Sequence, residues 1–153
     1  MTASQIKTTH PVSLYEQDYY LWLNTTIQQL KGRQFSALDI PNLIEEIEDI
    51  GRSERRALES NLVVVLVHLL KYQYQAEKRS NSWKASIREH RRRLRKALEE
   101  SPSLKGYIEE IFAECYQDAR KLASDETDLA LETFPMQSPF ELSSTLDPEF
   151  LPV

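Results

Sequence analysis

The histidine at position 68 offers the most chemistry in this sequence of 153 residues. His68 lies within the apolar run 62–70, and Lys71 and Tyr72 follow one helical turn later on the same side. A histidine in a buried helix needs a hydrogen-bond partner, and a carboxylate from a neighbouring helix would set its tautomer and its pKa. We expect His68 to be a core histidine with its hydrogen bond satisfied. The alternative is a general base or a metal ligand.

Three carboxylates share one face of a predicted helix, because Glu45, Glu48 and Asp49 are spaced i, i+3 and i+4. Glu45 and Glu48, with Asp18 and His68, are the candidate ligands of a metal-dependent hydrolase. The pattern is incomplete, since the chain has 3 histidines and contains neither Glu-x-x-His nor His-x-x-x-His. We therefore expect a solvated acidic face, no metal site and no cofactor.

The strongest compositional signal is a basic segment inside an acidic chain. Residues 77–96 carry a net charge of +7, whereas residues 97–153 carry -10 and the whole chain -5. On a helix, Arg88, Arg92 and Arg95 form one ridge at i, i+4 and i+7. We expect this ridge to form ion pairs with the chain's own acids or with another subunit. The alternatives are a nucleic-acid-binding ridge that follows a phosphate backbone and the binding of another anionic partner.

The other potential catalytic groups lack the partners that catalysis needs. Cys115 falls between Ile111 and Ala119 on the apolar stripe of a predicted helix, which is typical of a small buried hydrophobic residue. His90 lies beside such a stripe and is assigned a packing or hydrogen-bonding role. No Gly-rich phosphate loop and no Ser/His/Asp spacing occur in the chain. Apart from His68, no catalytic residue is predicted, and whether the protein is an enzyme is left open.

Helical periodicity and capping signals predict an all-α fold. We expect a bundle of four to five helices over residues 13–133, forming a single domain after a polar N-terminal arm of residues 1–12. The Pro-containing tail 134–153 alternates large apolar residues with polar ones and is expected to extend over the bundle. The predicted helices cover residues 14–31, residues 41–75 with a kink or break at Gly51, a segment that follows the polar break 80–82, and a segment from Ser101-Pro102 to about residue 124.

The first helix and the first part of the second are amphipathic. In each of them the apolar residues recur at helical spacing, and in the second helix acidic residues occupy the opposite face. From residue 58 to residue 70 the second helix becomes apolar nearly all round, which is typical of a central helix covered by neighbours. The apolar stripes consist of Tyr20, Leu23, Ile27 and Leu30 in the first helix and of Leu43, Ile44, Ile47 and Ile50 in the second.

Several motifs are similar to those of the bacterial, largely cyanobacterial, family known as domain of unknown function 29. The resemblance covers residues 14–152 and implies an all-helical single domain. Because no activity is established for that family, it assigns no catalytic residue here. The motifs are Tyr-Glu-Gln-Asp-Tyr-Tyr-Leu-Trp at 15–22, Leu-Ile-Glu-Glu-Ile-Glu-Asp-Ile-Gly-Arg-Ser-Glu-Arg-Arg at 43–56, His-Leu-Leu-Lys-Tyr-Gln-Tyr-Gln at 68–75, Ser-Asn-Ser-Trp at 80–83 with Arg88, and Leu-Asp-Pro-Glu-Phe-Leu-Pro at 146–152.

These observations favour a protein-interaction or regulatory module that binds a protein partner or forms a homo-oligomer. The longest apolar run spans nine positions and a bilayer needs roughly twenty, so we expect no membrane contact and a cytoplasmic location. The two alternatives are a nucleic-acid-binding module that uses the arginine ridge and a metal-dependent hydrolase centred on His68.

Overall fold

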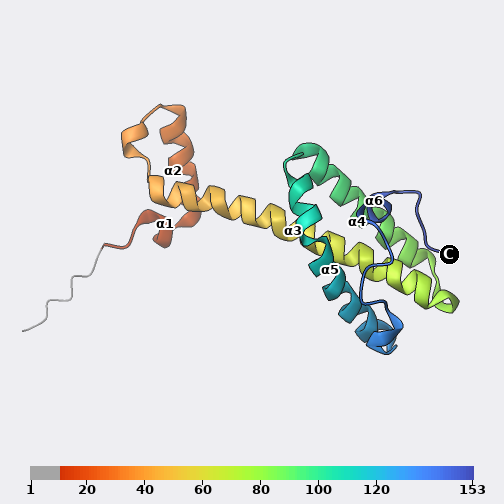
Figure 1. Cartoon of the computed structure of the whole chain (residues 1–153). Helices are drawn as coiled ribbons and strands as arrows, with labels where there is room; N and C mark the ends of the chain where they lie inside the picture. Colours follow the sequence, from red (N-terminus) through yellow and green to blue (C-terminus); the bar gives the residue numbers. More distant parts are fainter. Residues whose placement is uncertain (1–10) are drawn as a thin grey trace, which may run out of the picture. The chain divides into compact units, whose positions relative to one another are not determined.

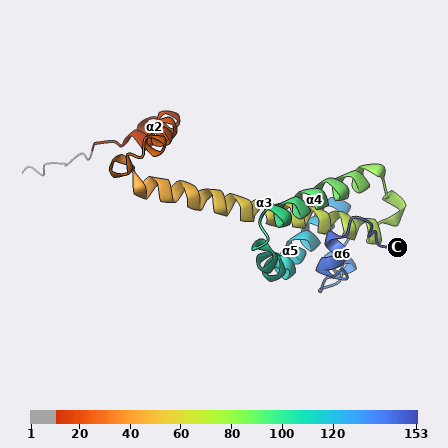
Figure 2. The ribbon, with the colours of Figure 1, turned by 90° about the horizontal axis from the view of Figure 1, so that it is seen from above.

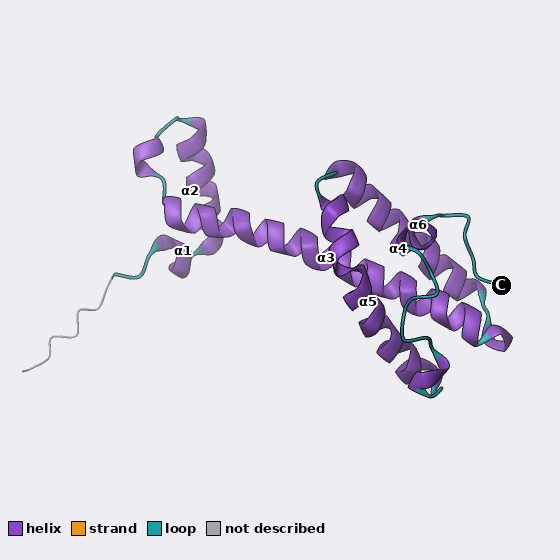
Figure 3. Ribbon diagram, in the orientation of Figure 1, coloured by secondary structure: helices purple, strands orange, loops and turns teal. Residues whose placement is uncertain are grey.

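The computed structural model describes residues 11–153, and these residues are helical with connecting loops and no strand (Figure 3). The all-α prediction is confirmed. The chain divides into two compact units, Met1–Gly51 and Arg52–Val153, which are described separately below. Most of the predicted N-terminal arm, residues 1–10, and with it His10, lies outside the described residues. The helices are α1 (Leu14–Gln17), α2 (Tyr19–Lys31), α3 (Ile40–Tyr74), α4 (Asn81–Glu100), α5 (Leu104–Thr127) and α6 (Leu142–Leu146), with short 3-10 turns at Phe35–Ala37, Ala76–Lys78 and Leu131–Thr133.

The helix boundaries correct the sequence prediction in three places. The segment 14–31 is broken at Asp18, because the Asp18 carboxylate accepts a hydrogen bond from the Leu21 N–H at 2.9 Å and caps a new helix. α3 continues through Gly51 without a break, since a single exposed glycine costs only about 1 kcal/mol of helix propensity. α5 begins at Leu104 rather than directly after Ser101-Pro102, which form a turn.

The first unit is organised around one carboxylate on α3. Glu46 accepts hydrogen bonds from the hydroxyls of Tyr15 at 2.6 Å and Tyr19 at 2.5 Å. The rings of these tyrosines contact Trp22, with centroid distances of 4.9 Å and 6.2 Å. The hydrogen bond to Glu46 raises the pKa of Tyr15 to about 12 and also raises the pKa of Tyr19. A fork of two phenols on one carboxylate therefore ties α1 and α2 to the start of α3.

The core of the second unit is formed by the C-terminal half of α3 together with α4 and α5. Figure 1 and Figure 2 show α4 beside this half of α3 in both views. The α3 segment from Leu58 to Leu70 carries most of the fully buried leucines and valines, as its all-round apolar pattern predicts. The neighbouring helices add Ile87, Leu94, Leu98, Ile108, Cys115, Tyr116, Ala119 and Ala123.

The C-terminal tail belongs to this core. Phe134 and Phe140 are buried in the same cluster as the helices. Because the tail is mostly irregular, its carbonyl groups have no helical partners and need other donors. Side chains of α5 supply several of these: the Tyr116 hydroxyl donates to Pro135 O at 2.5 Å, and Arg120 Nε donates to Phe134 O at 2.9 Å.

Arg91 of α4 holds the last part of the tail. Its side chain is 2 % exposed, and it donates to the carbonyl oxygens of Thr145 at 2.8 Å, Phe150 at 2.7 Å and Ser144 at 3.3 Å. Two of these carbonyls belong to the last turn of α6, where a positive charge is favourable. Arg91 thus fixes α6 and the chain end against α4.

We expect Arg91→Met to lower the free energy of unfolding by about 2 kcal/mol, because three buried carbonyls lose a charged donor. Arg93→Met removes the same side chain two positions further on, where it is exposed and ion-paired with Glu89. That variant should lose about 0.5 kcal/mol or less. Urea denaturation measures the free energy of unfolding of both variants. Equal decreases in the two variants would show that the contacts of Arg91 with the tail do not stabilise the fold.

We expect Glu46→Ala to return the pKa of Tyr15 from about 12 towards its ordinary value of 10.0, because the carboxylate acceptor is lost. The sign follows from linkage: a raised phenol pKa stabilises the fold below pH 10, and this contribution disappears as the pH rises towards 12. Absorbance titration of tyrosinate, with Tyr15→Phe to assign the signal, measures the shift. Glu45→Ala should have the smaller effect, since Glu45 acts on Tyr15 only through space.

Candidate functional site

The surroundings of His68 support a structural role. The residue is half-buried on α3, and its Nδ1–H donates to the carbonyl oxygen of Val64, one turn earlier, at 2.8 Å. Because a carbonyl can only accept, the ring proton is on Nδ1. Burial lowers the pKa of His68, and the charges of Lys71 and His90 add to this, while the Val64 hydrogen bond and Glu126 oppose it. The partner is therefore backbone rather than the carboxylate that the sequence suggested.

The proposed metal ligands give no assembled centre among residues 11–153. Asp18, Glu45 and Glu48 belong to the first unit and are exposed, whereas His68 belongs to the second. No group of three His, Cys, Asp or Glu side chains in this range is placed to hold a metal ion. The hydrolase hypothesis on His68 gains no support from these positions.

The basic ridge is only partly neutralised, and its partners are on its own helix. Glu89 receives hydrogen bonds from Arg92 at 2.8 Å and from Arg93 at 3.0 Å, and these contacts lower the pKa of Glu89 to about 2. Arg88 and Arg95 are exposed and make no hydrogen bond or ion pair with another residue of the described range. Within residues 11–153 the expected ion pair with one of the chain's own acids is thus present at Arg92 and absent at Arg88 and Arg95.

The ridge forms one wall of a hollow between α4 and the tail. This hollow has a volume of about 360 Å³, and Pro148 and Glu149 of the tail line its opposite side. The α4 side consists of Arg88, Arg92 and Arg95 together with the buried Arg91. The structure therefore brings the three ridge arginines to one concave site and adds a fourth that sequence reasoning did not single out.

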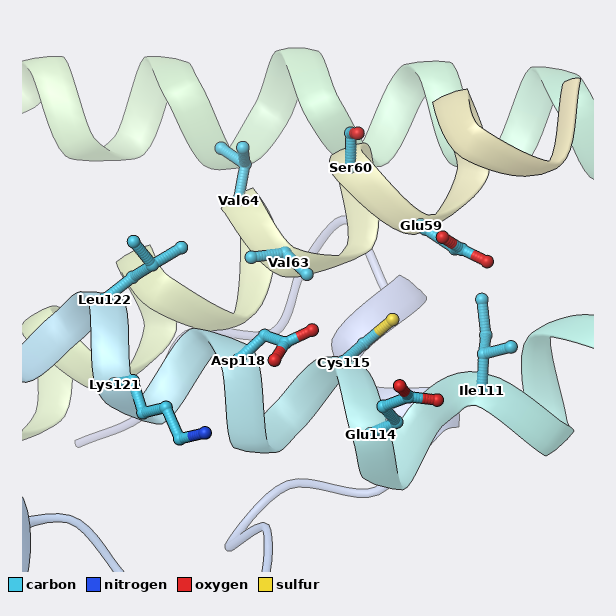
Figure 4. A pocket seen from close by; sticks show the side chains of 10 residues that line it. All are labelled: Glu59, Ser60, Val63, Val64, Ile111, Glu114, Cys115, Asp118, Lys121 and Leu122. Atoms are coloured by element: carbon cyan, nitrogen blue, oxygen red, sulfur yellow. The ribbon is translucent and has the colours of Figure 1, made fainter. Parts of the chain in front are cut away.

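A larger groove of about 690 Å³ lies between α3 and α5 in the second unit (Figure 4). Val63 and Val64 of α3 and Leu122 of α5 are among its apolar lining residues. Its remaining lining residues are Glu59, Ser60, Ile111, Glu114, Cys115, Asp118 and Lys121. An apolar floor with an acidic edge suits an apolar or basic group and offers no assembled catalytic set.

Cys115 lines this groove but is 4 % exposed. Burial raises the pKa of its thiol to about 11, and Glu59, Asp118 and Glu114 act in the same direction. The thiol is therefore protonated at neutral pH, whereas a nucleophilic cysteine needs a lowered pKa. The prediction of a buried hydrophobic cysteine is confirmed.

The apolar stripes of the first unit lie mostly on its surface. Trp22 is the one large apolar side chain that is buried within residues 11–51, and its indole N–H has no hydrogen-bond partner. Leu23 and Leu43 are half-buried, whereas the rest of both stripes is exposed. The exposed apolar residues of this range are Val12, Tyr19, Tyr20, Leu21, Ile27, Leu30, Phe35, Ile40, Ile44, Ile47 and Ile50.

Two residues with decisive contacts were not identified from the sequence. The sequence pattern does not distinguish Glu46 from its acidic neighbours. The structure distinguishes it, because only Glu46 accepts the hydrogen bonds from Tyr15 and Tyr19. Arg91 stands in a run of arginines, and only its position four residues after Ile87 and three before Leu94 marks it as part of the buried face. That spacing is the signal that could have separated it from Arg92 and Arg93.

The fold of residues 11–153 defines an all-α helical protein. Over residues 14–151 the chain matches the family described as Domain of unknown function DUF29, and it belongs to that family. No curated protein and no solved structure matches it. Among residues 11–153, no helix has the length and apolar character needed to cross a bilayer.

We expect the free energy of unfolding to fall as the pH is lowered from 7 to 5, and to fall less steeply in His68→Leu. The sign follows from the lowered pKa of His68: below pH 6.5 the unfolded chain takes up a proton that the folded chain does not. Chemical denaturation at several pH values measures the two slopes. Parallel slopes would contradict the lowered pKa, and a steeper slope in the variant would indicate pairing with a carboxylate.

Proposed function

We propose that this member of the DUF29 family is a protein-interaction module and that its first unit binds a partner presenting an amphipathic helix with basic flanks. One observation carries the proposal. Residues 11–51 expose eleven large apolar side chains and bury one, Trp22. Soluble monomers rarely keep contiguous apolar surface of this kind unless it serves binding.

The geometry of α3 supports a helical partner. At 100° per residue, Ile40, Leu43, Ile44, Ile47 and Ile50 fall within an arc of about 120°, the width of a helix stripe that packs on another helix. Ile47 and Ile50 are 61 % and 62 % exposed, so their side chains are available to fill such a contact. Burying one isoleucine of this kind contributes roughly 1.5–3 kcal/mol.

The charge around these stripes favours a basic partner over a second copy of the same surface. Residues 11–51 contain seven acids and two bases. Glu45 lies beyond the edge of the α3 stripe by helical spacing and is exposed. Two copies meeting face to face would bring these acids together, whereas lysines or arginines on a partner helix would complement them.

The test uses a synthetic amphipathic peptide with leucines on one face and lysines on both flanks of that face. We expect this peptide to bind the full chain in fluorescence anisotropy. Ile44→Gln/Ile47→Gln should weaken binding at least about tenfold, because each lost contact removes more than 1.4 kcal/mol. Both positions are exposed, so the variant should keep the helical content of the parent in circular dichroism.

The matched control is Leu122→Gln/Met136→Gln, which removes two exposed apolar side chains from the second unit. It should leave the affinity unchanged. A peptide of the same composition in scrambled order, or with glutamates in place of lysines, should not bind. If the Leu122→Gln/Met136→Gln variant loses binding, the contact lies in the α3–α5 groove. If the parent dimerises with rising concentration and the Ile44→Gln/Ile47→Gln variant does not, the partner is a second copy. Each result contradicts the proposal.

A further inference from the structure

We infer that the hollow between α4 and the C-terminal tail binds a compact phosphorylated small molecule through Arg88, Arg91, Arg92 and Arg95. This site lies in the second unit and is independent of the proposed protein contact. The four arginines are spaced i, i+3, i+4 and i+7, so they occupy one face of α4. The tail closes the opposite side with Pro148 and Glu149.

Arg91 makes the hollow electropositive from within. Arg91 is 2 % exposed and its guanidinium donates to three carbonyl oxygens, but it has no ion pair with a carboxylate within residues 11–153. Asp147 is the acid whose charge acts on it without forming an ion pair. Carbonyl dipoles satisfy hydrogen bonds without cancelling a full charge, so the wall of the hollow retains positive potential.

Electrostatic repulsion between the arginines that line the hollow destabilises α4. Arg88–Arg92 and Arg91–Arg95 are like-charge pairs at i, i+4, a spacing that destabilises a helix. Glu89 relieves this for Arg92, while Arg88 and Arg95 have no partner among the described residues. An anion in the hollow would remove the repulsion and meet planar donors suited to bidentate contact with phosphate oxygens.

The shape of the site favours a compact ligand over a long strand. A volume of about 360 Å³ falls at the lower end of small-molecule sites. The hollow is concave, and the Glu149 carboxylate lines the side across from the arginines. A nucleic-acid backbone running along the ridge would pass this carboxylate, whereas a ligand with one or two phosphates can be held by the arginines alone.

The probe is inorganic pyrophosphate, titrated into the full chain by calorimetry at low ionic strength. We expect binding that weakens with added salt. Arg88→Gln/Arg95→Gln should weaken it about tenfold or more, since two charged donors are lost. The matched control is Arg56→Gln/Lys105→Gln, which removes the same charge at exposed positions outside the hollow and should leave binding unchanged.

A gain of affinity provides a test of opposite sign. Glu149→Gln removes the acid from the hollow and should tighten pyrophosphate binding, and Glu89→Gln should do the same by releasing Arg92. The inference is overturned if pyrophosphate does not bind. It is also overturned if the Arg88→Gln/Arg95→Gln variant and the Arg56→Gln/Lys105→Gln control lose the same amount of affinity. Tighter binding of a single-stranded oligonucleotide at the same arginines would overturn it too, by showing that the ridge takes an extended polyanion.

Discussion

An irregular segment can enter a core only if its backbone polar groups find partners, and this requirement governs the second unit. The tail after α5 buries Phe134 and Phe140 among the helices, yet most of it is not helical. Its carbonyls are satisfied by side chains that reach across from α4 and α5. Burial of the tail in the apolar core and its polar contacts therefore depend on each other. Phe134 and Phe140 can be buried only because the tail carbonyls exchange their hydrogen bonds with water for side-chain donors.

Arg91 has the largest share in this arrangement and also sets the character of the surface above it. The tail needs the N–H donors of Arg91, and with them a positive charge is buried in the protein. The groups that contact this charge are carbonyl oxygens rather than a carboxylate. The same choice that stabilises the chain end leaves an electropositive hollow beside it. Stability and the proposed anion binding thus share one residue, and for this reason substitutions at Arg88 and Arg95 separate the two better than substitutions at Arg91.

The sequence predicts the parts of this protein that depend on local chemistry or on periodicity. The all-α class and the buried segment from Leu58 to Leu70 follow from propensity and apolar spacing. The break at Asp18 was missed because the apolar stripe begins only at Tyr20, so its spacing does not show whether residues 14–17 belong to the same helix. Amphipathic spacing also shows only that a face is apolar, and in the first unit that face lies open.

The candidate sites were less predictable, because they depend on which distant segment meets which helix. Nothing local in the sequence places Pro148 and Glu149 opposite the arginines of α4.

The single cysteine of the chain has a consequence for how copies of this protein can meet. The Cys115 thiol is buried and remains protonated at neutral pH, so neither oxidants nor a second thiol reach a reactive sulfur. We therefore expect association between folded copies to depend on concentration and ionic strength rather than on redox conditions.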